Sequence, residues 1–163
     1  MPASPPTLKR SFATANPVIL RHGPDPVGLI LDSSVLIAGE RRGETVKQVI
    51  ERLRASCGDV ECALSVISII ELTHGIYRAK SDADRAKRTA FCAELSRDMI
   101  VHPVSLAIAE LAGRIEGEQA ARGITIDFED LVIGATALHL GFDVATTNVK
   151  HFQQIPGLKI VPL

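Results

Sequence analysis

The chain has 163 residues, of which 46% are hydrophobic, and this suits one compact domain that folds without disulfides or structural metals. Its formal net charge is −1, so no overall basic field indicates nucleic acid, and such a partner must be held by a local patch or through metal ions. No apolar stretch approaches the ~20 residues that cross a bilayer, so no membrane association is expected.

The three cysteines are Cys57, Cys62 and Cys92, an odd number without a C-x-x-C pair. A zinc knuckle or a secreted disulfide framework is therefore not expected, and the reducing cytoplasm is the natural location. We interpret all three cysteines as small apolar side chains of the protein interior.

The first segment, residues 1–27, contains most of the nine prolines and has no continuous apolar stretch of the kind that a signal peptide needs. We expect it to be an extended or disordered leader. A folded domain is expected over residues 28–163, where short apolar runs alternate with helical periods.

The predicted elements of this domain follow one another as single strands and helices. In chain order they are a strand over 28–31, helices over 33–38 and around 46–53, a strand over 60–64, helices over 68–79 and 81–98, a strand over 99–101, helices over 105–122 and 129–140, and strands over 143–146 and 158–161. The helix over 105–122 is indicated by Leu106, Ala109, Ala112 and Ile115 at spacings of three. Strands separated by helices predict an α/β sandwich with a central, mostly parallel sheet. Open sheets of this kind place their ligands at the edge where the strands end.

Four polar residues fall at that edge. Asp32 ends the first strand, Glu71 lies in the first turn of the helix predicted from Ser68, Asp130 opens the helix over 129–140, and Asn148 follows the strand over 143–146. Each acid has a structural explanation, as a helix cap for Asp32, as part of an S-x-x-E capping box for Glu71, and as a helix-dipole partner for Asp130. Taken together, the carboxylates would repel one another and need a cation, for which Mg²⁺ or Mn²⁺ is the natural choice.

The successive motifs of residues 28–163 resemble those of PIN-domain nucleases, in particular the VapC-type toxins of bacterial toxin–antitoxin pairs. The segments that carry the resemblance are LILDSSVLIA, SVISIIELTHGI, GITIDFEDLVIGATALHLGFDVATTNVKHF and IPGLKIV. On the resemblance, Asp32, Glu71 and Asp130 are the metal-holding and catalytic acids, with Ser34 as a supporting hydroxyl. The fourth catalytic position, aspartate or asparagine in relatives, falls on Asn148.

The resemblance implies a three-layer sandwich, Mg²⁺- or Mn²⁺-dependent hydrolysis of RNA, a homodimer, and inhibition by a cognate antitoxin protein. The chain departs from the family pattern at His151, where relatives often carry an acidic residue. Because of this departure, a fifth carboxylate and a second bound metal ion are not implied by the resemblance. The first three acids match the family pattern.

Other polar residues near these motifs are interpreted as structural. Adjacent helical residues point roughly 100° apart, so Asp127 and Glu129 are not expected to share a metal with Asp130, and Asp127 is expected to cap the helix. Glu71 and His74 have an E-x-x-H spacing, but a di-iron site needs two such pairs. The remaining histidines, His22, His102, His139 and His151, have no metal-ligand spacing.

A basic cluster follows the Glu71 helix and consists of Arg78, Lys80, Arg85, Lys87 and Arg88. Such a cluster is typical of a solvated helix face, and it is also a candidate surface for contact with RNA phosphates.

The sequence is also compared with what three alternative functions would require. A receiver-like signalling module would need an adjacent acidic pair after the first strand, where Ser33 follows Asp32 instead, and no phosphate-binding glycine motif follows any strand. A catalytically silent binding subunit is disfavoured by the three acids. An RNA-processing nuclease that is not a toxin has the same sequence pattern, and genomic context would separate the two.

Overall fold

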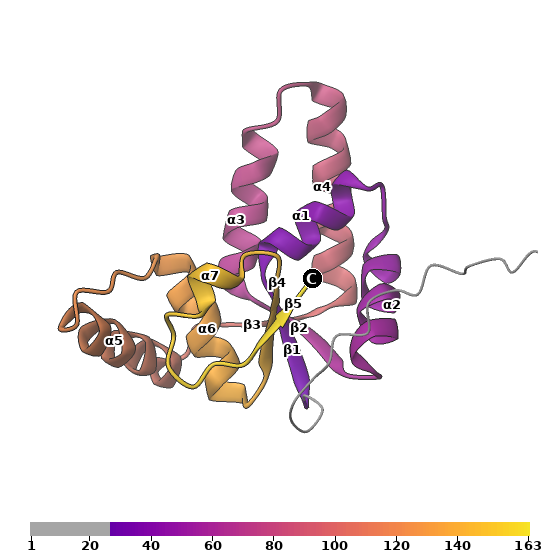
Figure 1. Cartoon of the computed structure of the whole chain (residues 1–163). Coiled ribbons are helices and arrows are strands. Elements are labelled where there is room, and N and C mark those ends of the chain that lie inside the picture. Colours follow the sequence, from indigo (N-terminus) through magenta and orange to yellow (C-terminus); the bar gives the residue numbers. More distant parts are fainter. Residues whose placement is uncertain (1–26) are drawn as a thin grey trace, which may run out of the picture.

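A computed structural model of the chain describes residues 27–163, which fold as a parallel sheet between two layers of helices (Figure 1). The leader predicted for residues 1–27 lies, except for Val27, outside the described residues. The strands are β1 (Gly28–Leu31), β2 (Glu61–Ser65), β3 (Ile100–His102), β4 (Asp143–Thr146) and β5 (Ile160–Pro162). They lie in the order β3-β2-β1-β4-β5, and each neighbouring pair is parallel. The predicted α/β sandwich is confirmed.

Helices fill the connections between these strands. They are α1 (Ser33–Arg41), α2 (Val46–Cys57), α3 (Val66–Tyr77), α4 (Asp82–Asp98), α5 (Leu106–Ala120), α6 (Phe128–Leu140) and α7 (Val149–Phe152). The α7 helix was not predicted, because four residues are too short to have a recognisable hydrophobic period. No helix within the described range 27–163 is both long and apolar enough to cross a membrane.

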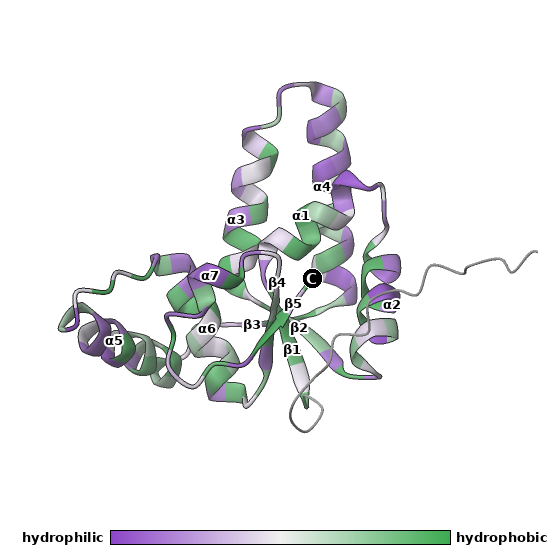
Figure 2. Cartoon of the chain, in the orientation of Figure 1, coloured by the Kyte–Doolittle hydropathy of each residue, from purple (hydrophilic) through white to green (hydrophobic). Residues whose placement is uncertain are grey.

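Alternate residues of the buried strand β1 point into two separate cores. Leu29 and Leu31 pack with residues of α1, α2, α3 and α4 on one face of the sheet. Ile30 packs with residues of α5, α6 and α7 on the other face. Figure 2 shows the hydrophobic strands at the centre and the hydrophilic outer part of α4. This alternation explains why a continuous apolar run over 28–31 is a strand covered by helices on both sides.

The spacing that predicted α5 indicates the helix correctly but does not identify its buried face. Leu106 is 76% exposed, whereas Ile108, Ala112, Ile115 and Gln119 are buried. The buried positions follow the i, i+4, i+7, i+11 pattern of a helix, and a strict spacing of three drifts away from it.

The parallel arrangement brings the carboxyl ends of all five strands to one edge of the sheet. The chain leaves β1 toward β2 on one side, and β4 lies on the other side of β1, so the strand order reverses between β1 and β4. Open parallel sheets bind ligands at such a reversal, because the connections diverge there and leave a crevice. Asp32 follows β1 and Asn148 follows β4, and both therefore lie at this point.

Candidate active site

Asp32 is held at the carboxyl end of β1 by contacts from β4. Its backbone N–H donates to the carbonyl of Ala145 over 3.0 Å, which extends the pairing of the two strands. Its side chain is almost completely buried, and Oδ2 accepts hydrogen bonds from the Ser34 hydroxyl at 2.5 Å and the Thr146 hydroxyl at 2.7 Å. Asp32 is the N-cap residue of α1, as the structural explanation expected, but its side chain makes no capping hydrogen bond to the helix.

Both hydroxyls are oriented by backbone groups of the segment that follows β4. The N–H of Thr147 donates to Ser34 Oγ over 3.2 Å, and the N–H of Asn148 donates to Thr146 Oγ1 over 2.8 Å. Because each oxygen accepts from the backbone, its own hydrogen is directed at Asp32 Oδ2. Sequence reasoning identified Ser34 and missed Thr146, whose contact with Asp32 spans 114 positions.

Glu71 lies in the second turn of α3, because the helix begins earlier than predicted. Its N-cap is Ser65, whose side chain accepts from the N–H of Ile67, so the predicted capping box of Ser68 and Glu71 is wrong. Ser68 is buried and donates to the carbonyl of Leu31 over 3.3 Å. The side chain of Glu71 is therefore available for another role.

The carboxyl group of Glu71 is partly buried beside other acids. Burial raises its pKa to about 7, and the negative charges of Asp32 and Asp130 contribute to that rise, while a hydrogen bond from Ser33 opposes it. Its Oε2 atom is inaccessible and has no hydrogen-bond partner among the described residues. A buried carboxylate oxygen without a donor is unfavourable unless a cation contacts it.

Asp130 lies in the first turn of α6, as predicted, and its side chain is 14% exposed. Burial raises the pKa of this carboxyl group, the charge of Asp32 adds to the rise, and a hydrogen bond with His151 lowers it. Asp32, Glu71 and Asp130 thus influence one another electrostatically from three elements that are distant in the chain. The structure brings together the three acids that the sequence singled out.

His151 also belongs to this site, which corrects its interpretation as a residue without metal-ligand potential. Its Nδ1 lies 2.9 Å from Asp130 Oδ2, 3.7 Å from Asp127 Oδ2 and 3.3 Å from the Asn148 side-chain nitrogen. Asp127 is the N-cap residue of α6 but makes no capping hydrogen bond with its side chain. Within the part of the chain that the structure describes, Asp127, Asp130 and His151 form the group whose ligand atoms all lie within 4.8 Å of one another.

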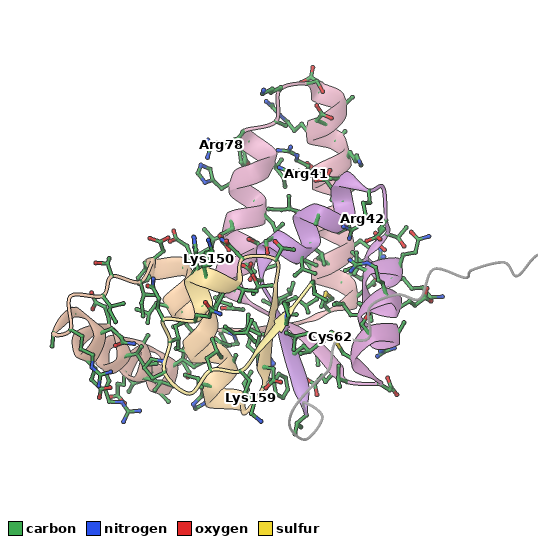
Figure 3. The ribbon with its side chains drawn as sticks, in the orientation of Figure 1. Arg41, Arg42, Cys62, Arg78, Lys150 and Lys159 are labelled. Carbon is green, nitrogen blue, oxygen red and sulfur yellow. The ribbon has the colours of Figure 1, made fainter. Side chains whose placement is uncertain are left out.

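A groove of about 400 Å³ begins at Glu71 and extends between α1, α3 and α4. Its polar lining includes Ser33, Glu71, His74, Glu129, Arg41 and Arg78. Figure 3 shows Arg41 and Arg78 beside the α3–α4 pair, which extends beyond the sheet. Sequence reasoning missed Arg41 as a groove residue, because no local pattern connects it with α3.

The five residues of the predicted basic cluster differ in their surroundings. Lys87 donates to the Glu40 carbonyl at 2.9 Å, and Arg88 donates to the Gly75 carbonyl at 2.6 Å, so both cations hold α4 against neighbouring segments. Arg88 lines the groove together with Arg78, whereas Lys80 and Arg85 are exposed and do not line it. Arg78 is the exposed member of the cluster that lines the groove.

The donor set fits a divalent cation. It consists of the carboxylates of Asp32, Glu71 and Asp130, of which Glu71 and Asp130 have pKa values raised by burial and by the charge of Asp32, and it includes the buried and unpartnered Oε2 of Glu71. Hard oxygen donors of this kind are the ligands that Mg²⁺ and Mn²⁺ prefer. Asp32, Glu71 and Asp130 are the acids that would hold the ion. Among the described residues, ligand atoms within 4.8 Å of one another are found for Asp127, Asp130 and His151 and not for these three acids, so their side chains would have to move closer together to share an ion.

Comparison with known proteins gives a consistent result. Residues 29–158 match the model of the PIN domain family. Ribonuclease VapC1 of Rickettsia felis is 31% identical over 135 residues, which cover 83% of this chain and 96% of that protein. The VapBC-5 crystal structure from Mycobacterium tuberculosis, described as a member of the VapBC family of toxin–antitoxin systems, matches with a TM-score of 0.68 and 26% identity over 85% of this chain and 100% of that chain. The DNA-bound VapBC structure from Salmonella typhimurium shares the fold, with a TM-score of 0.70 and 24% identity over 83% of this chain and 98% of that chain.

We predict that the metal-free protein loses stability as the pH rises from about 4.5 to about 7. The pKa of Glu71 is about 7 in the folded protein and 4.5 as an unperturbed group, so across this window the unfolded chain ionises freely while the folded chain does not. Glu71→Gln stays neutral, so its free energy of unfolding should change less over the same window. Urea denaturation in the presence of a chelator measures both proteins.

The matched control is Glu116→Gln, which changes an exposed glutamate on α5 and should leave the pH dependence of the wild type unaltered. Because the pKa of Asp130 is also raised, the free energy of unfolding of Glu71→Gln should still decrease somewhat as the pH rises. Equal slopes for the wild type and Glu71→Gln would show that the surroundings of Glu71 do not raise its pKa.

Proposed function

The chain belongs to the PIN domain family, and from this premise we propose that it is a metal-dependent endoribonuclease that acts as the toxin of a toxin–antitoxin pair. One observation carries the catalytic part: Glu71 and Asp130 have raised pKa values because both are partly buried and face the charge of Asp32. We assign the activity to residues 28–163 and place it in the cytoplasm, where the RNA is.

We assign the ion-binding atoms from the contacts that each carboxylate already makes. Both hydroxyls that contact Asp32 reach Oδ2, so Oδ1 is the atom we assign to the ion. The unpartnered Oε2 of Glu71 and the carboxylate of Asp130 complete the set. When bound, Mg²⁺ or Mn²⁺ supplies an acidified water as nucleophile and offsets charge on the phosphate.

The remaining residues of the site orient its components. Ser34 and Thr146 fix the rotamer of Asp32, because both hydroxyls are tied to the backbone after β4. The Asn148 side chain lies beside His151 and is close enough to the acids to hold a water or a phosphate oxygen. Such supporting contacts usually change metal affinity or activity 10- to 100-fold, by a rough estimate, when they are removed.

The substrate is proposed to be RNA that enters through the groove between α1, α3 and α4. Arg41 and Arg78 line the groove that begins at Glu71, so a phosphate next to the cleaved one would lie within reach of a cation. The chain has one tyrosine and no tryptophan, so extended stacking on bases is not expected to provide recognition. We therefore expect the protein to recognise RNA through contacts with its backbone and through its shape.

The proposed regulation rests on the relatives. Two of the similar structures are of VapBC, and VapBC-5 is described as a member of the VapBC family of toxin–antitoxin systems. We therefore propose a cognate antitoxin as the partner of this chain, and a homodimer as its own assembly. An RNA-processing nuclease would need the same active site, so the test must include growth as well as cleavage.

We predict that the purified protein cleaves RNA with Mg²⁺ or Mn²⁺ and that Asp32→Asn lowers the cleavage rate by at least about 100-fold, since a neutral amide holds a dication far less well than a carboxylate does. Asp59→Asn is the matched control, because Asp59 is exposed and precedes β2 at the opposite edge of the sheet. Thermal melting should confirm that both variants are folded. Equal cleavage by Asp32→Asn and the wild type would remove the proposed site.

Expression in cells distinguishes a toxin from a processing enzyme. The wild type should arrest growth and produce one dominant set of new RNA 5′ ends, and Asp32→Asn should do neither. Coexpression of a small protein encoded next to this gene should restore growth. Normal growth during full expression of an active wild type would exclude the toxin function and leave the nuclease function in place.

We predict that Arg41→Ala and Arg78→Ala weaken RNA binding by similar amounts. Each should raise KM, leave kcat nearly unchanged and lower the slope of log affinity against log salt by about one, as expected for the loss of one phosphate contact. Arg122→Ala, at an exposed position that follows α5, is the control that should change neither quantity. An equal change in all three variants would indicate a nonspecific charge effect and exclude the groove as the RNA path.

A further inference from the structure

One face of α3 forms a continuous wall of the groove. The residues of this face follow the i, i+3, i+4, i+7 spacing and all line the groove, and they are Glu71, His74, Gly75 and Arg78. Since a helix rises about 1.5 Å per residue, His74 lies about 4.5 Å and Arg78 about 10.5 Å beyond Glu71 along the helix axis. His74 therefore lies between the proposed ion site and the cation at the outer end of α3 (Figure 3).

The side chain of His74 is available to a ligand in this groove. It is exposed, and within the described part of the chain it makes no hydrogen bond or ion pair. Other polar residues of the groove are engaged, since Arg88 donates to the Gly75 carbonyl over 2.6 Å and Ser33 makes a hydrogen bond with Glu71. An imidazole has an N–H group that donates and, when neutral, a second nitrogen that accepts.

Open space lies beside His74 on the same face of α3. A Cβ atom added at Gly75 would meet no heavy atom within 4 Å outside its own stretch of helix. Because Gly75 lines the groove without a side chain, the backbone of α3 forms the wall at this point. A group as large as a sugar can therefore approach the helix directly beside the imidazole.

The two ends of this face determine what passes between them. The ion held by the acids would contact the cleaved phosphate, and Arg78 would contact the next phosphate of the strand. A nucleoside joins two successive phosphates, and its ribose belongs to the strand backbone whereas its base branches away. The ribose therefore passes beside His74. Its 2′-hydroxyl group both donates and accepts hydrogen bonds, and it is the group by which a protein distinguishes RNA from DNA.

We propose that His74 makes the protein prefer RNA to DNA by binding the 2′-hydroxyl group of the nucleotide between the cleaved phosphate and the phosphate at Arg78. This contact depends on the proposed nuclease function and deepens it. A metal-activated water attacks phosphates of RNA and DNA alike, and arginines bind both backbones. Discrimination between the two polymers therefore needs a contact with the sugar, and His74 is placed to provide it.

The test combines a 2′-deoxy substitution in the RNA with substitutions of His74. The substrates are a short RNA with one mapped cleavage site and two copies of it, each with a single 2′-deoxynucleotide on one side of the cleaved phosphate. The wild type should cleave one of the two deoxy substrates with a kcat/KM about five-fold lower, since one hydrogen bond is lost. His74→Ala and His74→Phe should cleave the RNA about five-fold less efficiently than the wild type and should cleave that deoxy substrate as well as the RNA.

Two controls separate this contact from general effects. His139→Ala changes an exposed histidine near the end of α6 and should keep the preference of the wild type. A 2′-deoxynucleotide several positions away from the cleaved phosphate should leave cleavage unchanged in every protein. Thermal melting checks that each variant is folded.

Other results would overturn the proposed contact. Equal sensitivity to the deoxy substitution in the wild type and His74→Ala would assign the 2′-hydroxyl group to another residue, and no sensitivity in the wild type would exclude the contact. A preference retained by His74→Phe would indicate stacking instead of a hydrogen bond. A salt slope lowered by about one in His74→Ala would indicate a phosphate contact.

Failure of this contact and failure of the nuclease function are distinguishable. If the wild type cleaves RNA and Asp32→Asn does not, the nuclease function stands whatever the role of His74. If the wild type cleaves RNA with neither Mg²⁺ nor Mn²⁺, the nuclease function and the sugar contact are both wrong.

Discussion

The repulsion among a few carboxylates at the edge of a parallel sheet is the constraint on which the rest of the site depends. Asp32, Glu71 and Asp130 come from β1, α3 and α6, and the fold holds them near one another although burial and mutual charge make ionised Glu71 and Asp130 unfavourable. A protein interior tolerates this arrangement when a cation compensates the charge. The fold therefore maintains a site that is unfavourable without a cation, which supports the proposed binding of a metal ion.

The three acids differ in the contacts that surround them. Asp32 is held in place by its backbone and by its side chain. Its backbone N–H donates to the carbonyl of Ala145, and its side chain accepts hydrogen bonds from two hydroxyl groups. Glu71 has a buried oxygen without a donor, and Asp130 lies against His151. The groove begins at Glu71, with Arg41 and Arg78 farther along it, so the positive charges lie where a polyanion would approach. An overall charge of −1 is compatible with RNA binding when the binding depends on a local group of cations and a metal ion.

The sequence indicated the fold through strands that alternate with helices. It indicated the three acids through their places where those elements begin or end, together with the resemblance to PIN-domain nucleases, on which the choice of Asp130 mainly rests. Local patterns also misled, since Ser68 and Glu71 match a capping box that the structure excludes by starting α3 after Ser65. Thr146 was missed, and Asp127 and His151 were interpreted without the contacts that His151 makes with Asp127 and Asp130, because these contacts join distant segments of the chain. Spacing along the chain does not reveal such contacts, although the parallel sheet dictates the edge at which they form.

The most direct measurement of the central claim is a crystal structure of the Mn²⁺-loaded protein with anomalous difference maps at the manganese edge. We expect an anomalous peak within about 2.3 Å of carboxylate oxygens from Asp32, Glu71 and Asp130 together. Peaks confined to other surfaces, with these three side chains directed away from one another, would contradict it.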